Sequence, residues 1–153
     1  MLRFFARDML EVQGARHSIE RIGKLADGII SFGPFGIGLD GLLTWIPFVG
    51  AAYSVGAGVS LIALGARARV PVTVLAQVGA IVLARSGIGE VPLAGQIAVD
   101  LFRGHKWAAD LLTKSIDQTL YIDGPKDRGR PEYLEAVRAI REGREKRRIV
   151  FLG

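Results

Sequence analysis

Charged residues are distributed very unevenly along this 153-residue chain, and their pattern constrains the fold more than any other feature. Residues 28–99 hold five charged side chains in 72 positions, whereas the two flanking segments hold the other 30 in 81 positions. Within this centre, residues 41–66 run for 26 positions without a charge. A surface helix in water needs a polar face, so an apolar centre between charged ends is typical of a chain that contacts both lipid and water.

The charge pattern predicts three parts. Residues 1–26 form an amphipathic N-terminal helix, residues 27–113 an apolar membrane domain of two helical hairpins, and residues 114–153 a basic C-terminal helix and tail. The first part has apolar side chains three and four positions apart, which places them in one stripe on a helix, with an interruption at Gly14. The predicted fold is therefore all-α: a small membrane-associated helical hairpin protein with amphipathic terminal helices.

Two apolar segments form the predicted first hairpin. Residues 48–66, beyond Pro47, are 19 residues long, close to the ~20 needed to cross a hydrocarbon core. Residues 72–84 are only 13 long, which favours a buried or re-entrant helix. Arg67 and Arg69 mark the turn between them. Small residues recur along the first segment and predict close contact with another helix; the candidate helix-packing residues are Gly50, Ala52, Gly56, Gly58 and Ser60.

A short motif occurs twice. Ile46-Pro47-Phe48-Val49-Gly50 is matched 45 residues later by Val91-Pro92-Leu93-Ala94-Gly95. Apolar-Pro-x-x-Gly places Pro in the first turn of a helix, where its missing N–H costs nothing. Two such units predict two hairpins about a pseudo-symmetric centre.

These motifs also carry a family resemblance. Residues 25–112 resemble the domain of unknown function 4112 family, through both Pro-x-x-Gly units and through these further segments: Leu25-Ala26-Asp27, Gly38-Leu39-Asp40, Ala66-Arg67 with Val70-Pro71, and Asp100-Leu101-Phe102. In that family each Pro-x-x-Gly is usually followed by Asp, but here Ala51 and Gln96 stand there. Gly104-His105-Lys106-Trp107 replaces a polar, Asn-rich stretch. The resemblance implies a helical, membrane-associated protein. This chain lacks the acidic and amide groups that the family usually has at those positions.

The C-terminal part is basic. The chain has a net charge of +5, with ten Lys or Arg between Lys114 and Arg148. This balance favours anionic partners, and beside an apolar centre we expect lipid headgroups or an acidic protein surface and no nucleic acid. A helix is predicted to begin at Pro131 and to continue to Arg148, with Glu142 and Lys146 paired on it. The candidate lipid or partner surface consists of Arg141, Arg144, Lys146, Arg147 and Arg148.

No pattern predicts an enzyme, a metal site or a cofactor. Gly36–Gly41 fits GxGxxG by its letters, yet no strand precedes it, so a hinge loop is favoured over a nucleotide site. Ser54 lies in an apolar helix, which favours packing over nucleophilic catalysis. His17 and His105 have no partner at metal-ligand spacing, although axial ligation by a lone histidine stays open. The absence of Cys excludes disulfides and thiolate sites.

Asp40, Arg85 and Glu90 are ionisable groups within the apolar half. Burying such a charged group in hydrocarbon costs free energy, so an ionisable residue within a membrane segment usually indicates a functional site. We favour a position at the interface, in loops beside the apolar segments, and Arg85 could pair with Glu90 across the turn between them.

The sequence therefore predicts a membrane-embedded structural or accessory subunit of a larger membrane complex, with no small-molecule substrate evident. A bacterial inner membrane is the expected location, with both charged termini cytoplasmic. Arg67 and Arg69 would then place positive charge at the far turn, a conflict that a re-entrant hairpin removes. The alternative is a soluble helical domain with a lipid-binding apolar cavity.

Overall fold

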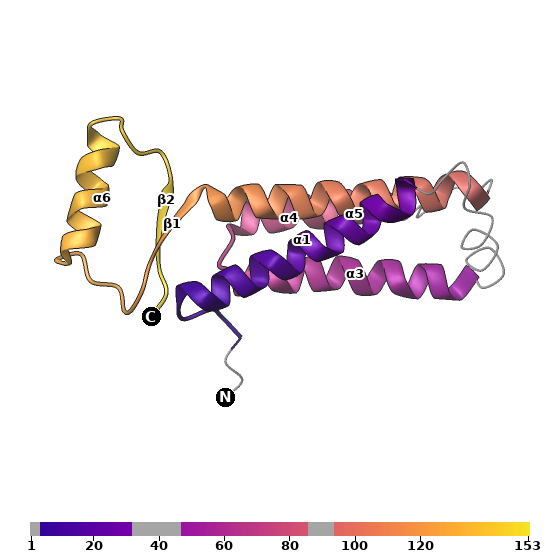
Figure 1. The fold of residues 1–153 in the computed structure, drawn as a ribbon, viewed down its shortest axis with the longest axis horizontal. Coiled ribbons are helices and arrows are strands. Elements are labelled where there is room, and N and C mark those ends of the chain that lie inside the picture. Colours follow the sequence, from indigo (N-terminus) through magenta and orange to yellow (C-terminus); the bar gives the residue numbers. More distant parts are fainter. Residues whose placement is uncertain (1–3, 32–46, 86–93) are drawn as a thin grey trace.

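The computed structural model describes residues 4–31, 47–85 and 94–153, with side-chain contacts for residues 4–25, 55–84 and 104–153. Four long helices run side by side (Figure 1): α1 (Met9–Ser31), α3 (Pro47–Arg67), α4 (Val72–Arg85) and α5 (Ala94–Asp117). α1 packs against α3 and α5, and α4 packs against the same two helices. Successive helices are antiparallel. The chain is therefore mostly helical, as predicted, and its main body is an up-down-up-down four-helix bundle.

Apolar residues spaced by three and four build the core of this bundle. On α1 the buried positions are Val12, Ala15 and Ile19, so the predicted stripe is present. The helix begins at Met9 and continues through Gly14 without a break. Burying each large aliphatic side chain stabilises the fold by about 1.5–3 kcal/mol. The other helices contribute Leu61, Val78, Ala108, Ala109, Leu112 and Ile116.

Two glycines allow α3 to approach its neighbours closely. A Cβ atom on Gly58 would lie 2.7 Å from Cγ1 of Val82, on α4. A Cβ atom on Gly65 would lie 2.6 Å from Cδ2 of Leu112, on α5. These separations are shorter than real carbon contacts, so a larger residue at either site requires the neighbouring side chain or its helix to shift.

The turn between α3 and α4 connects the bundle to both ends of the chain. The sequence predicted this turn, and it closes with two hydrogen bonds that run from Arg69 N to Ala66 O and from Val70 N to Gly65 O. Arg69 has a φ of 55°, the left-handed conformation that ends many helices in this way. The Ala6 N–H donates to Arg67 O at 2.9 Å, so the N-terminal segment lies against the turn.

The turn therefore lies at the same end of the bundle as both ends of the described chain (Figure 1). A full membrane crossing would have placed its two arginines on the side opposite to the termini, whereas a re-entrant hairpin would not. Four antiparallel helices return the chain to the end from which it started, so Arg67 and Arg69 are near the charged terminal segments instead.

The C-terminal part is a small β-α-β unit. Strands β1 (Thr119–Ile122) and β2 (Arg148–Phe151) form a parallel pair in which Thr119 aligns with Arg148, and α6 (Pro131–Arg141) connects them. The strands are an addition to the predicted all-helical fold. The predicted helix begins at Pro131 as expected, but its extension to Arg148 and the pairing of Glu142 with Lys146 were wrong. Gly143, at φ 72°, follows the last turn, and β-branched Ile149 and Val150 favour a strand.

Within residues 4–31, 47–85 and 94–153, no helix combines the length and the apolar character needed to cross a membrane. The predicted spanning helix is thus not supported there.

Two glycines on different helices provide a test of the packing. Gly14→Ala should raise the free energy of unfolding by about 0.5–1 kcal/mol, because a Cβ there meets nothing within 4 Å and Ala favours helix. Gly58→Leu should lower it by about 1–3 kcal/mol through overpacking against Val82. Thermal unfolding followed by circular dichroism measures both. If both variants changed the free energy of unfolding by the same amount and in the same direction, the assignment of Gly14 to an exposed face and of Gly58 to a buried face would be contradicted.

Candidate functional site

The five basic residues predicted as a surface are all exposed and lie around the end of α6 and the start of β2. Arg144 pairs with Glu142, and Arg147 pairs with Glu145 at 2.6 Å. Arg148 donates a hydrogen bond to the backbone oxygen of Arg69 at 2.7 Å. Three of the five guanidiniums or ammoniums are thus engaged within the chain, and the surface left for a partner centres on Arg141 and Lys146.

Glu145 is the most perturbed acid of this region. Its carboxylate accepts hydrogen bonds from the Arg147 side chain and from the backbone N–H groups of Arg147 and Lys146, which lower its pKa to about 2. Each bond favours the ionised form. Glu145 therefore stays charged at neutral pH, and its hydrogen bonds to Lys146 and Arg147 lie within the connection between α6 and β2.

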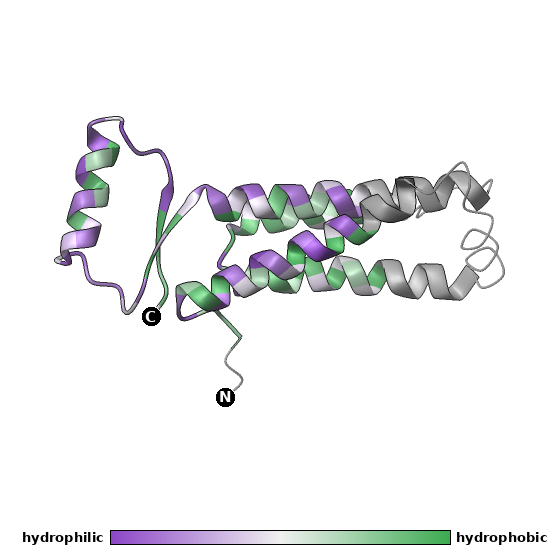
Figure 2. Cartoon of the chain, viewed as in Figure 1, coloured by the Kyte–Doolittle hydropathy of each residue, from purple (hydrophilic) through white to green (hydrophobic). Residues whose placement is uncertain are grey.

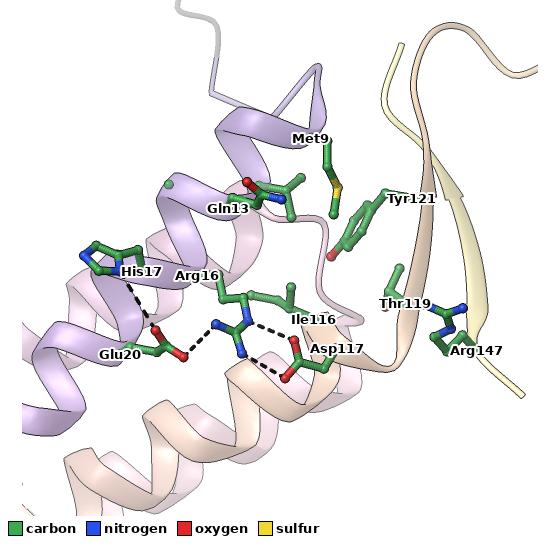
Figure 3. Close-up of a pocket in the computed structure, with 12 residues that line it drawn as sticks. Met9, Gln13, Arg16, His17, Glu20, Ile116, Asp117, Thr119, Tyr121 and Arg147 are labelled. Atoms are coloured by element: carbon green, nitrogen blue, oxygen red, sulfur yellow. Dashed lines mark hydrogen bonds and ion pairs between the residues drawn. The ribbon is translucent and has the colours of Figure 1, made fainter.

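A cavity of about 660 Å³ lies where α1, the end of α5 and β1 meet (Figure 3). Arg16 crosses its floor and donates to Asp117 at 2.8 Å and to Glu20 at 2.6 Å. The hydrogen bond that Arg16 donates to Asp117 is the main cause of the raised pKa of the Arg16 guanidinium. His17 Nδ1 lies 4.0 Å from Glu20 on the rim. Because Arg16 engages both carboxylates, this arrangement ties α1 to α5 and does not present an activated base.

Tyr121, on β1, also lines this cavity. Its hydroxyl donates to Ala68 O at 2.7 Å, and burial raises its pKa. This bond joins the β-α-β unit to the α3–α4 turn, which sequence reasoning missed because the strand itself was not predicted.

His105 lies inside the bundle on α5, only 2% exposed. A Cβ atom on Gly58 would lie 3.7 Å from its Nε2, an ordinary van der Waals distance, so the imidazole lies beside α3 at Gly58. Its neighbour Trp107 is half exposed on the outer surface. Among the described residues, no three His, Asp or Glu side chains are grouped so that they could hold a metal ion.

The predicted helix-packing residues separate into different environments. Gly58 is buried between helices, whereas Gly56 and Ser60 are exposed, and a Cβ on Gly56 would meet nothing within 4 Å. Gly50 and Ala52 lie in α3, outside the described side chains, as does Ser54. Within the chain the close contacts come from Gly58 and from Gly65, seven residues on. A seven-residue spacing is the signal that could have identified Gly65.

Several other candidates fall outside the described parts. Asp40, Glu90 and the Gly36–Gly41 motif lie outside the described residues, and the side chain of Arg85 is not described.

The outward faces of α3 and α4 form the most unusual surface of the molecule. Between residues 55–66 and 72–84 these two adjacent helices carry no charged side chain. In Figure 2 the described parts of α3 and α4 are coloured mostly hydrophobic, whereas α1 and α5 include many hydrophilic residues. A helix in water normally has a polar face, and residues 55–66 and 72–84 lack the charged side chains that such a face usually carries. The exposed large side chains of this surface are Val55 (62%), Val59 (60%), Val72 (80%) and Leu83 (60%).

A family model described as a domain of unknown function (DUF4112) matches residues 15–116. The chain belongs to the DUF4112 family. The match confirms the resemblance found in residues 25–112 and extends it at both ends. No curated protein matches the chain, and neither does any solved structure.

The DUF4112 match covers the bundle from α1 to α5 and ends before β1. Both cavity-lining Arg16 and the charge-free faces of α3 and α4 belong to the family-matched part. The β-α-β unit and the basic residues around it lie outside that part.

The pKa of Glu145 provides a test of the connection before β2. Because its folded pKa lies below the ordinary value of 4.5, the carboxylate contributes to stability above about pH 4.5, and this contribution is lost as the pH falls towards 2. NMR titration of the Glu145 carboxyl group should give a midpoint near 2. In Arg147→Ala the midpoint should return towards the ordinary value; an unchanged midpoint would show that Arg147 is not the cause.

Proposed function

We propose that this DUF4112 protein is a membrane-associated structural or accessory subunit that docks onto lipid through the outward faces of α3 and α4. The charge-free surface of these two helices is the observation that carries the proposal. Its four large exposed side chains would each gain on the order of 1–2 kcal/mol on leaving water, since they are mostly but not fully exposed. Together they outweigh the contribution of any single surface charge.

The basic residues supply a second, weaker attraction. Each Lys or Arg near an anionic membrane surface contributes about 1 kcal/mol, and salt screens this contribution. Internal ion pairs at Arg144 and Arg147 reduce the number of charges available for it. The apolar faces therefore set the strength of membrane binding, and the basic tail selects anionic headgroups.

The proposed orientation places both chain ends in the cytoplasm at an inner bacterial membrane. Both ends of the described chain lie together with Arg67 and Arg69 at one end of the bundle (Figure 1). This grouping agrees with the preference of basic segments for the cytoplasmic side. A full crossing is not required by this arrangement.

The assembly role rests on the exposed small residues of α3. Gly56 and Ser60 lie one turn apart on the outward face, where a helix of another membrane protein could approach the backbone. Because Gly56 and Ser60 themselves have small side chains, they offer a second copy or a partner subunit a close contact with the backbone that lipid alone does not use.

Vesicle flotation tests the lipid-binding face. The wild-type chain should float with vesicles of phosphatidylcholine and phosphatidylglycerol, and should stay bound at about 1 M salt, where the Debye length is about 3 Å. Val59→Asp should weaken partitioning about thirtyfold, the equivalent of about 2 kcal/mol for a charge brought to hydrocarbon.

The matched control is Leu134→Asp, which introduces the same charge at a half-exposed position on α6. It should float like wild type. Equal losses in the two variants, or a wild-type chain that remains unbound, would contradict docking through α3 and α4.

A further inference from the structure

The segment before α1 presents two phenylalanine rings to solvent. Phe4 is 46% exposed and Phe5 is 56% exposed, and their rings meet edge to face with centroids 5.3 Å apart. An aromatic side chain gains free energy when it leaves water, and adjacent exposed rings add these gains at one place. We call these two residues the phenylalanine pair.

The backbone beside the pair is fixed, although the rings themselves are not buried. Ala6, the next residue, is fully buried. Its N–H donates to Arg67 O at 2.9 Å, and its C=O accepts from Nε of Arg69 at 3.3 Å. The α3–α4 turn therefore holds this segment in place by its main chain and leaves the rings uncovered.

The two acids near the pair are occupied within the chain. Asp8 accepts from the Glu11 N–H at 2.8 Å, and Glu11 accepts from the Arg7 N–H at 3.1 Å, so both carboxylates cap the start of α1. Glu11 also lies 3.9 Å from the guanidinium of Arg67. These bonds reduce the repulsion that the two carboxylates would exert on an anionic partner.

The arginines near the pair are less occupied. The guanidinium carbon of Arg69 lies 5.9 Å from the centroid of the Phe5 ring, and the exposed Arg7 follows two residues later. Arg69 donates to Ala6 O and Leu152 O, and Arg148 donates to Arg69 O. Within the described parts of the chain, Arg69 and Arg148 thus bond backbone oxygens and have no carboxylate partner. Positive charge therefore surrounds the phenylalanine pair.

The pair lies near one end of the charge-free faces of α3 and α4. Val72, the first residue of α4, is the most exposed large side chain of those faces and stands three positions after Arg69. Both lie at the end of the bundle where the described chain begins (Figure 1). Apolar side chains next to arginines are typical of a surface at a membrane interface, because rings reach the acyl chains while guanidiniums stay among the headgroups.

We propose that Phe4 and Phe5 insert into anionic lipid and anchor this end of the bundle to the membrane. The inference rests on the proposed docking of α3 and α4 and adds a second contact, made by a different segment. Because the backbone beside the rings is already fixed, little conformational entropy is lost when they bind. Arg7 and Arg69 would lie among the lipid phosphates.

Flotation of the full chain with vesicles of phosphatidylcholine and phosphatidylglycerol tests the anchor. Phe4→Ser with Phe5→Ser should weaken partitioning by about tenfold or more, because two half-exposed rings no longer leave water on binding. The matched control, Leu134→Ser with Ile140→Ser, removes two apolar side chains of similar exposure from α6 and should float like wild type. Phe4→Trp with Phe5→Trp should bind at least as tightly as wild type, since Trp favours the interface.

The charge next to the pair is tested separately. Arg7→Gln should weaken binding to the anionic vesicles about fivefold, the contribution of one basic residue near such a surface. Binding to vesicles of phosphatidylcholine alone should not change. An equal loss on both kinds of vesicle would contradict a contact between Arg7 and anionic headgroups.

One comparison separates the anchor from the docking of α3 and α4. If the Phe4→Ser, Phe5→Ser variant floats normally while Val59→Asp does not, the anchor is wrong and the docking stands. Equal losses in the two serine double variants would also overturn the anchor. A wild-type chain that stays unbound would contradict both proposals. If wild type self-associates in solution and the Phe4→Ser, Phe5→Ser variant does not, the rings form a contact between copies, which would overturn the anchor as well.

Discussion

The carbonyl groups at the end of α3 are the point on which the rest of the structure depends. The last carbonyls of a helix have no partner within it and must find one elsewhere. Here Arg67 O accepts from the N-terminal segment, Ala68 O accepts from Tyr121 of β1, and Arg69 O accepts from Arg148 of β2. One turn thus joins three segments that are far apart in sequence. The left-handed conformation of Arg69 ends the helix and sets the direction of the carbonyls at the turn. The Arg69 guanidinium also donates two hydrogen bonds, to Ala6 O and to Leu152 O.

This junction gives the molecule two unlike regions. At one end it gathers both ends of the chain, the β-α-β unit and most of the basic residues. Along the bundle, α1 and α5 carry charges outwards, while residues 55–66 of α3 and 72–84 of α4 contain no charged side chain. The core alone does not require this asymmetry, because inward-facing residues such as Leu61 and Val78 would pack equally well beneath polar outer faces. The proposed docking onto lipid accounts for this charge-free surface.

Much of the bundle could be predicted from the sequence because local rules decide it. Pro47 and Pro131 begin helices, Arg67 to Pro71 forms a turn, and the stripe through Val12, Ala15 and Ile19 is buried. Which side of α3 faces the core could not be predicted, because a helix that is apolar all round has no periodic pattern of polar residues. In the structure Gly58 and Gly65 pack against neighbouring helices, whereas Gly56 does not.

The strands escaped prediction for a different reason. Each is only four residues long and is stabilised by a partner about 30 positions away, as Thr119 is by Arg148. The charged residues around Arg144 fit a helix by local propensity, and only the tertiary pairing of β1 with β2 overrides it.

The sidedness of the bundle is measured most directly by single-cysteine spin labelling, for which the chain is suited because it contains no cysteine. Labels at Val59 and Ala80 would report on the outward faces of α3 and α4, and labels at His17 and Lys114 on those of α1 and α5. In anionic vesicles, the first two should collide with dissolved oxygen and be shielded from a water-soluble nickel reagent, and the second two should show the reverse. Equal access of the nickel reagent to all four positions would contradict a lipid-covered α3–α4 face.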